Sequence, residues 1–147
     1  MSGTPRISST DFKNLNCKSM GAQLVRKRQT EEEDLQMACV SWVELHLRVY
    51  PILKWMFHTP NGGKRSKAEA GRFKAMGVKS GVPDLLLNAR CGKWAGFAIE
   101  LKSSTGAVSD DQVEWIQHYS AEGYLVILEC RTIDAFITAV KRFLSGV

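Results

Sequence analysis

The spacing of hydrophobic positions predicts a long helix in the first third of the chain. Between residues 30 and 50, apolar side chains recur every three or four positions, which is typical of one face of a helix that ends before Pro51. Thr30, with Glu33 three residues later, matches a capping box and places the helix start at Thr30. The predicted apolar face consists of Leu35, Cys39, Trp42, Val43 and Val49.

Residues 1–29 differ from this pattern. They are polar, show no sustained periodicity and end in the basic run Arg26, Lys27 and Arg28. We therefore expect a flexible or loosely docked basic extension, followed by one domain over residues 30–147.

The central part of the chain alternates short apolar runs with turn signals. Residues 53–59 predict a strand that stops at Pro60 and the Asn-Gly-Gly turn after it. Residues 66–77 predict a basic helix that stops at Gly77. The apolar segments 83–89 and 94–102 are joined by a short turn and predict an antiparallel hairpin.

The last third predicts a helix, a strand and a helix. Ser109 and Gln112 suggest a capping box for a helix that stops at Gly123, and the continuous apolar run 124–130 predicts a strand buried on both faces. Residues 132–146 predict a closing helix with one apolar face. The whole order indicates an α/β fold, in which helices cover the two faces of a mixed sheet.

Composition supports a single globular domain. The 147 residues are 44% hydrophobic and 24% charged. No apolar run approaches the roughly 18 residues of a membrane span, and the first residues lack the apolar middle of a signal peptide, so we expect a cytosolic protein with no membrane partner. The four cysteines are scattered without a Cys-x-x-Cys pair, which favours reduced thiols.

The net charge of +5 is concentrated in one segment. Residues 61–80 contain six basic residues and one acidic residue, so this segment accounts for the whole excess. Such clustering indicates a polyanionic partner, although a solvated basic helix is an equally good interpretation. The basic residues are Lys64, Arg65, Lys67, Arg72, Lys74 and Lys79.

Two acids and a lysine lie where the predicted hairpin ends. Glu100 and Lys102 are two residues apart at the end of an apolar strand, and Asp84 stands at the start of its partner strand. Two neighbouring carboxylates favour a hard divalent cation such as Mg²⁺ between them, and Lys102 could orient a water or stabilise a phosphate. Alternatively, Asp84 only caps the turn after Pro83, and Glu100 only pairs with Lys102.

These residues carry a family resemblance. Pro83-Asp84 followed by Glu100-Leu101-Lys102 resembles the PD…(D/E)xK signature of restriction-endonuclease-like nucleases, whose αβββαβ core matches the predicted element order. More closely, the segments 58–87, 98–116 and 123–140 resemble stand-alone phage and bacterial members of the VRR-NUC family. The likeness runs from about Thr30 to the C-terminus.

The resemblance implies roles for the acidic cluster. Asp84 and Glu100 would bind Mg²⁺, or Mn²⁺ as a substitute, through their carboxylates, Leu101 would contribute its backbone carbonyl, and Lys102 would act on the attacking water. An acid on the first helix would complete the site. Glu31, Glu32 and Glu33 are the candidates, and we choose Glu32 because Glu33 has the predicted capping role. Gln112 matches a family glutamine near the active site, although a capping box alone would place a glutamine there.

The resemblance also implies DNA contacts. His58 and Asn61 match a histidine and an asparagine before the basic helix. Lys79 and Ser80 stand where the family has arginine-type positions, which leaves the strength of phosphate contact there open. The expected DNA-binding set is His58, Asn61, Lys64, Arg65, Lys67, Arg72 and Lys79.

Taken with the resemblance, the sequence predicts a Mg²⁺-dependent DNA endonuclease in a bacterial or phage-infected cell. The family implies structure-selective cutting, with four-way junctions as the leading substrate and flaps as another. Two cuts in a two-fold symmetric junction favour a homodimer. The alternatives are a non-catalytic DNA-binding protein with the same fold and an enzyme that acts on RNA or modified DNA.

Overall fold

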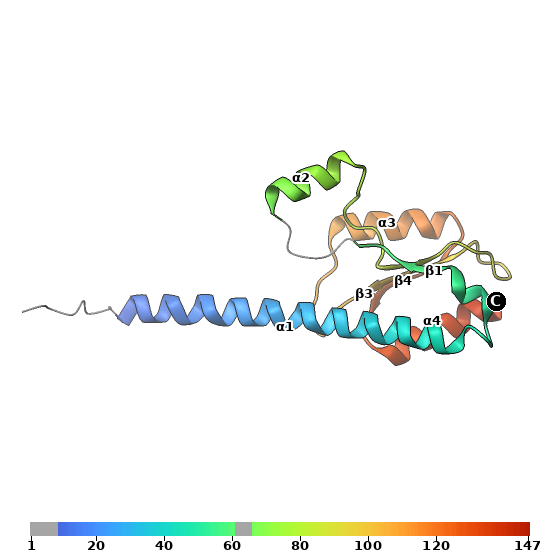
Figure 1. Cartoon of the computed structure of the whole chain (residues 1–147), viewed down its shortest axis with the longest axis horizontal. Helices are drawn as coiled ribbons and strands as arrows, with labels where there is room; N and C mark the ends of the chain where they lie inside the picture. The colour runs from blue at the N-terminus through green and yellow to red at the C-terminus, as the bar shows by residue number, and fades with distance from the viewer. Residues whose placement is uncertain (1–8, 61–65) are drawn as a thin grey trace, which may run out of the picture.

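A four-stranded sheet forms the centre of the molecule, and helices cover both of its faces (Figure 1). The computed structural model describes residues 9–60 and 66–147, with side chains at all of these positions except 9–22, 28, 29 and 67. The elements in chain order are α1 (Ser9–His46), the 3-10 helix η1 (Pro51–Trp55), β1 (Met56–His58), α2 (Lys67–Ala75), β2 (Leu85–Leu87), β3 (Phe97–Leu101), α3 (Asp110–Ala121), β4 (Leu125–Cys130) and α4 (Ile133–Ser145).

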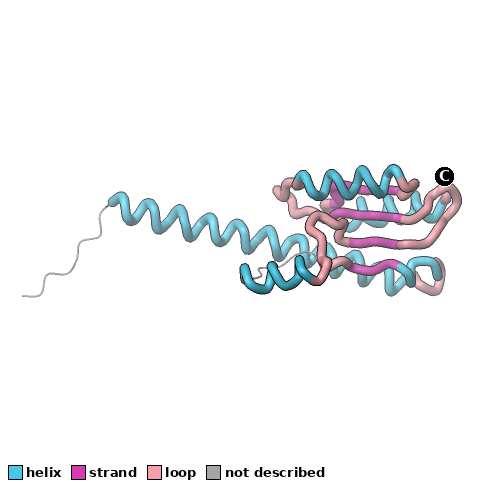
Figure 2. Tube along the Cα trace, turned by 90° about the horizontal axis from the view of Figure 1, so that it is seen from above, coloured by secondary structure: helices cyan, strands magenta, loops and turns pink. Residues whose placement is uncertain are grey.

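The strands lie side by side in the order β1-β2-β3-β4 (Figure 2). β2 pairs antiparallel with β1 and with β3, where Leu86 lies opposite Ala98, so the predicted hairpin is confirmed. β3 and β4 are parallel, with Ala98 opposite Val126. Parallel neighbours need a crossover, and α3 supplies it. The sheet is therefore mixed, as the sequence predicted.

The core forms between the sheet and one pair of helices. α1 and α4 lie on one face of the sheet and α3 on the other (Figure 1). The apolar face predicted for α4 is buried: Phe143 stacks on Phe97 with ring centroids 5.5 Å apart, and Phe136 meets Trp42 edge-on at 6.0 Å. Each buried phenylalanine stabilises the fold by about 1.5–3 kcal/mol relative to an exposed one.

The first helix is longer than predicted. α1 begins at Ser9, so the capping box proposed at Thr30 is wrong. Thr30 lies inside the helix, where its Oγ1 donates to the main-chain oxygen of Arg26 at 3.0 Å, and Glu33 is exposed. Residues 9–29 contain no proline and one glycine, so nothing in their sequence interrupts a helix. In both views the N-terminal part of α1 projects beyond the sheet (Figures 1 and 2).

Three smaller predictions also need correction. α1 ends at His46, so Val49 lies outside the helix and is 65% exposed. The strand predicted over 53–59 forms only at Met56–His58, because Pro51 opens a 3-10 turn just before it. β4 was predicted to be buried on both faces, yet it is an edge strand whose central residues 126–128 are half-buried.

The helix boundaries predicted from caps are otherwise confirmed. In addition, Ser66, which was not predicted as a cap, caps α2 by accepting from the amide of Glu69. Ser109 and Gln112 form a complete capping box at the start of α3. Gly77 and Gly123 follow their helices with φ values of 89° and 82°.

The cysteines within the described residues have free thiols at Cys39, Cys91 and Cys130. Burial raises the pKa of Cys39 to about 12, which makes this thiol a core residue with little reactivity. None of the helices in the described part of the chain has the length and apolar character needed to cross a membrane.

Candidate active site

The end of β3 buries an ion pair. Glu100 and Lys102 are only 2% and 6% exposed, and Lys102 Nζ donates to Glu100 Oε1 at 2.7 Å. Charged side chains are almost never buried this deeply unless they are paired. The strand brings them to this place because β3 is apolar up to Ile99 and lies inside the sheet.

The two carboxylate oxygens of Glu100 have different surroundings. Oε1 accepts from Lys102 and also from Gln112 Nε2, so the capping glutamine of α3 reaches across to β3. Oε2 is buried and has no hydrogen-bond partner among the described residues. An unsatisfied buried acceptor costs about 1–3 kcal/mol, so this oxygen is suited to a ligand that neutralises it.

Asp84 is held beside Glu100 by both neighbouring strands. Its Oδ2 accepts from the amide of Leu101 at 2.8 Å. Its main-chain oxygen accepts from the amide of Thr59 at 2.9 Å and is hydrogen-bonded to His58 Nδ1 at 3.0 Å. The hairpin thus brings Asp84 and Glu100 to the same end of the sheet, as their spacing predicted.

The carboxylates destabilise one another's charged forms. Burial raises the pKa of Glu100 to about 7; the charge of Asp84 adds to this rise and Lys102 opposes it. Burial also raises the pKa of Asp84, against the lowering effects of the Leu101 amide, Lys102 and His58. Glu32 raises the pKa of both groups by its own charge. A cation would relieve this repulsion.

The first helix reaches the site through Glu31 and Glu32. Glu32 Oε1 accepts from the amide of Ser103 at 2.9 Å, and Glu31 Oε2 accepts from the amide and hydroxyl of Ser104 at 3.2 and 2.9 Å. Of the three candidate acids, Glu32 is the one whose charge acts on both Asp84 and Glu100, whereas Glu33 is exposed. The two glutamates fix the turn that follows Lys102.

Arg131 fixes the other side of the same turn, and the sequence reasoning missed it. Its guanidinium donates to the main-chain oxygens of Ser103 and Gly106 and pairs with Glu129 at 2.7 Å. No local pattern marks Arg131 as part of the site, because the two main-chain oxygens that it holds lie 28 and 25 positions earlier in the chain. Glu31 was one of the three candidate acids, but its contact with Ser104, which spans 73 positions, was not predicted.

The predicted DNA-binding residues are only partly described. His58 lies beside Asp84 and is exposed. Arg72 is exposed on α2, which stands away from the sheet (Figure 1), and Lys79 lines a pocket next to α3. Asn61, Lys64 and Arg65 lie outside the described residues, as does the side chain of Lys67.

The site offers some, but not all, of the ligands that a bound cation needs. Across the described residues, no three side chains of histidine, cysteine, aspartate or glutamate converge as a ready set of metal ligands. The site offers the carboxylates of Asp84 and Glu100, including the unpartnered Glu100 Oε2. Mg²⁺ is commonly bound by one or two carboxylates, with waters and substrate phosphates completing its shell, so these residues fit that ion.

Comparison with known proteins shows the family to which the sequence and the fold belong. The sequence profile of the VRR-NUC domain matches residues 30–131. A solved structure described as a VRR_NUC domain protein is similar, with 25% sequence identity and a TM-score of 0.63. The similarity covers 79% of this chain and 89% of the other. A search of curated proteins finds no significant match.

Proposed function

Because the chain belongs to the VRR-NUC domain family, a family of nucleases, we propose that it is a metal-dependent endonuclease that hydrolyses phosphodiester bonds in DNA. The observation that carries the proposal is the buried oxygen Glu100 Oε2, which has no partner among the described residues although it lies in a cluster with Asp84 and Lys102. An ion pair with a purely structural role would require neither a second carboxylate beside it nor a buried oxygen without a partner.

Asp84 and Glu100 would hold Mg²⁺, or Mn²⁺ in its place, with the backbone carbonyl of Leu101 as a further ligand. When bound, the cation would lower the pKa of a water molecule and balance charge on the reacting phosphate. Lys102 is held by Glu100 at 2.7 Å, so its ammonium group has a fixed position. There it orients the attacking water and stabilises negative charge that develops on the phosphate.

The surrounding residues maintain this arrangement. Gln112 donates to Glu100 Oε1, which fixes the direction of the carboxylate. Glu32 holds the amide of Ser103, which follows Lys102 directly. Because such contacts limit the movement of the reacting groups, their loss reduces rate without removing the groups themselves.

The substrate is proposed to be branched DNA, with a four-way junction first. The basic segment 61–80 supplies the charge that phosphate binding needs. Two symmetric cuts need two active sites, so we propose a homodimer. In support, Leu24 and Val25 of α1 are 55% and 47% exposed, so a second copy could cover these apolar side chains.

The test is cleavage of end-labelled DNA by the full chain. A four-way junction, a flap and a linear duplex are compared with Mg²⁺, with Mn²⁺ and with a chelator. We expect metal-dependent cutting of the junction, and light scattering should show two chains per particle. The variants are Asp84→Asn, which keeps an acceptor for the Leu101 amide, and Lys102→Met, with Lys141→Met on the exposed face of α4 as the matched control.

Both active-site variants should bind the junction in chelator and fail to cut it, while the control cuts normally. If the wild-type protein binds all three DNAs and cuts none with either metal, the chain is a DNA-binding protein that retains a nuclease fold. If Asp84→Asn cuts at the wild-type rate, the proposed site is wrong.

A further inference from the structure

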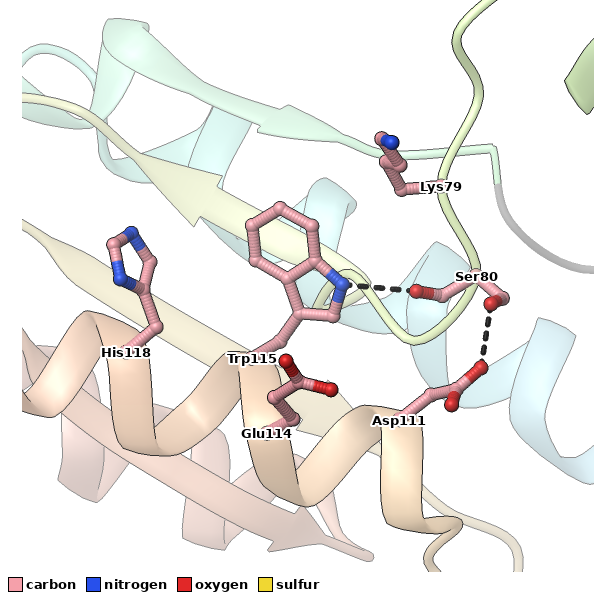
Figure 3. Close-up of a pocket in the computed structure, with 6 residues that line it drawn as sticks. All are labelled: Lys79, Ser80, Asp111, Glu114, Trp115 and His118. Atoms are coloured by element: carbon pink, nitrogen blue, oxygen red, sulfur yellow. Dashed lines mark hydrogen bonds between the residues drawn. The ribbon is translucent and has the colours of Figure 1, made fainter. Parts of the chain in front are cut away.

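A pocket of about 490 Å³ lies between α3 and the segment that leads into β2 (Figure 3). This volume falls within the roughly 300–1,000 Å³ of small-ligand sites. The lining combines an indole, an imidazole, an ammonium group, a hydroxyl and two carboxylates. The residues are Lys79, Ser80, Asp111, Glu114, Trp115 and His118.

Three contacts hold the two walls of the pocket together. Trp115 Nε1 donates to the main-chain oxygen of Ser80 at 2.9 Å, and Ser80 Oγ donates to Asp111 Oδ2 at 2.5 Å. Gly81 has a φ of 77° and lies so close to α3 that a Cβ there would be 2.5 Å from the main-chain carbon of Asp111. The pocket is therefore built before any ligand arrives.

Trp115 is supported as an aromatic wall. Its ring stacks on Tyr119 with centroids 5.9 Å apart and an interplanar angle of 29°, and His118 meets it edge-on at 6.1 Å. Tyr119 in turn contacts Tyr124 at 4.9 Å. In Figure 3 the indole rises from α3 between His118 and the segment that carries Lys79 and Ser80. A ring held in this way offers a fixed surface for stacking.

The pocket adjoins the candidate active site through two connections. Asp111 and Gln112 are neighbours in the first turn of α3; Asp111 accepts from Ser80 in the pocket, whereas Gln112 donates to Glu100. On the opposite wall, Ser80 precedes Asp84 by four positions in the chain. A nucleotide close to a phosphate held at Asp84 and Glu100 is thus within reach of the pocket.

The charges of the lining select the ligand. The lining contains one lysine and two carboxylates, so a phosphate group alone would be repelled more than attracted. A nucleobase suits the same residues, because its ring stacks on an indole and carboxylates accept from its N–H groups. Lys79 can meet the phosphate of that nucleotide. Base pairs inside a duplex hide both the ring faces and the N–H groups, so the base must be unpaired.

We propose that this pocket binds an unpaired nucleobase of the DNA, next to the phosphate that is cut. The proposal rests on the proposed nuclease function and deepens it, because it gives a physical reason for a preference for branched over linear DNA. A flap offers unpaired bases directly, and a four-way junction offers them where base pairs open at the branch point, whereas an intact duplex offers none.

The test measures binding in chelator, so that it does not depend on cutting. Fluorescence anisotropy compares 5′-flap and 3′-flap DNA with the same flaps in which the three nucleotides next to the branch are abasic. We expect at least one intact flap to bind about fivefold or more tightly than its abasic form. A linear duplex serves as the reference for binding to phosphates alone.

Two variants at Trp115 separate stacking from structure. Trp115→Phe and Trp115→Leu both lose the hydrogen bond to Ser80, but only phenylalanine keeps an aromatic face. Phenylalanine should retain most of the preference for the intact flap, and leucine should abolish it, with duplex binding unchanged in both. Trp55→Leu, at a tryptophan that is 62% exposed on η1, should keep the full preference.

Equal binding of intact and abasic flaps by the wild-type protein would overturn this proposal and leave the nuclease function standing. A preference that survives in Trp115→Leu would also overturn it, because the base would then bind elsewhere. Failure to bind any of the DNAs would contradict the nuclease function itself.

Discussion

The end of β3 and helix α2 carry the same kinds of charged side chain in opposite environments. Glu100 and Lys102 are almost fully buried and bonded to each other, whereas Arg72 and Lys74 are exposed on a helix that stands away from the sheet. Buried charges interact strongly and adopt one geometry; exposed charges are screened by water and salt. The comparison teaches that catalysis requires buried charges with a fixed geometry, whereas phosphate binding can use exposed charges.

The largest effect should come from Glu100→Gln, which keeps the shape of the side chain and removes its charge. Loss of the charge weakens cation binding and the position of Lys102, so cleavage should fall at least about a hundredfold. Initial rates on the junction measure this. Glu44→Gln, at an exposed position on α1, is the control, and similar loss in both variants would contradict a special role for the buried carboxylate.

The next effect concerns stability. Lys102→Met leaves Glu100 buried without its cation, which should cost about 3 kcal/mol of unfolding free energy at pH 8. Because Lys102 lowers the pKa of Glu100, its removal raises that pKa further, and at pH 6 the neutral carboxyl should reduce the cost. Urea unfolding at both pH values tests this. Equal losses at pH 6 and pH 8 would show that the charge of Glu100 is not responsible.

Glu32 tests whether the first helix acts through the turn after Lys102. Glu32→Ala removes the acceptor of the Ser103 amide, and cleavage should fall about tenfold. Glu32→Gln keeps an acceptor oxygen and should lose less. Cleavage rates of both variants at saturating Mg²⁺ distinguish loss of the hydrogen bond from loss of the charge. An equal loss in the two would mean that the charge of Glu32, and not its hydrogen bond, matters.

The pH dependence should follow from the raised pKa of Glu100. In the folded protein without metal this pKa is about 7, above its usual value of 4.5, so ionisation of Glu100 removes stability as the pH rises from about 4.5 through 7. Cation binding requires the ionised form, so Mg²⁺ affinity should increase about tenfold between pH 6 and pH 8. Calorimetric titration measures it. In Glu100→Gln the remaining pH dependence should be smaller; an unchanged slope would refute the assignment.

The smallest effect is expected on α2. Arg72→Ala should weaken junction binding only a few-fold and reduce the salt slope of the affinity by about one, because one phosphate contact is lost. The cleavage rate at saturating DNA should stay unchanged. Lys141→Ala, at an exposed position on α4, is the control variant, and its binding should match that of the wild-type protein. A fall in the saturated rate of Arg72→Ala would place α2 in the chemistry.

Part of the candidate site was predictable because its signals are local. Glu100 and Lys102 alternate with apolar residues on one strand, Asp84 follows a proline at the start of the partner strand, and Gln112 completes a capping box with Ser109. Arg131, the contact of Glu31 with Ser104 and the pocket around Trp115 were missed. Their roles depend on contacts between residues that are distant in the chain, for which one sequence holds no signal.

The sequence by itself determined the order of the elements, the capping box of α3, the glycines that end α2 and α3, and the placement of the acids at the ends of two strands. These features depend on neighbours within a few positions. Only the tertiary structure decided that β4 is an edge strand and that Glu100 keeps a buried oxygen without a partner among the described residues. Edge position and burial are properties of packing, which arises when distant segments meet.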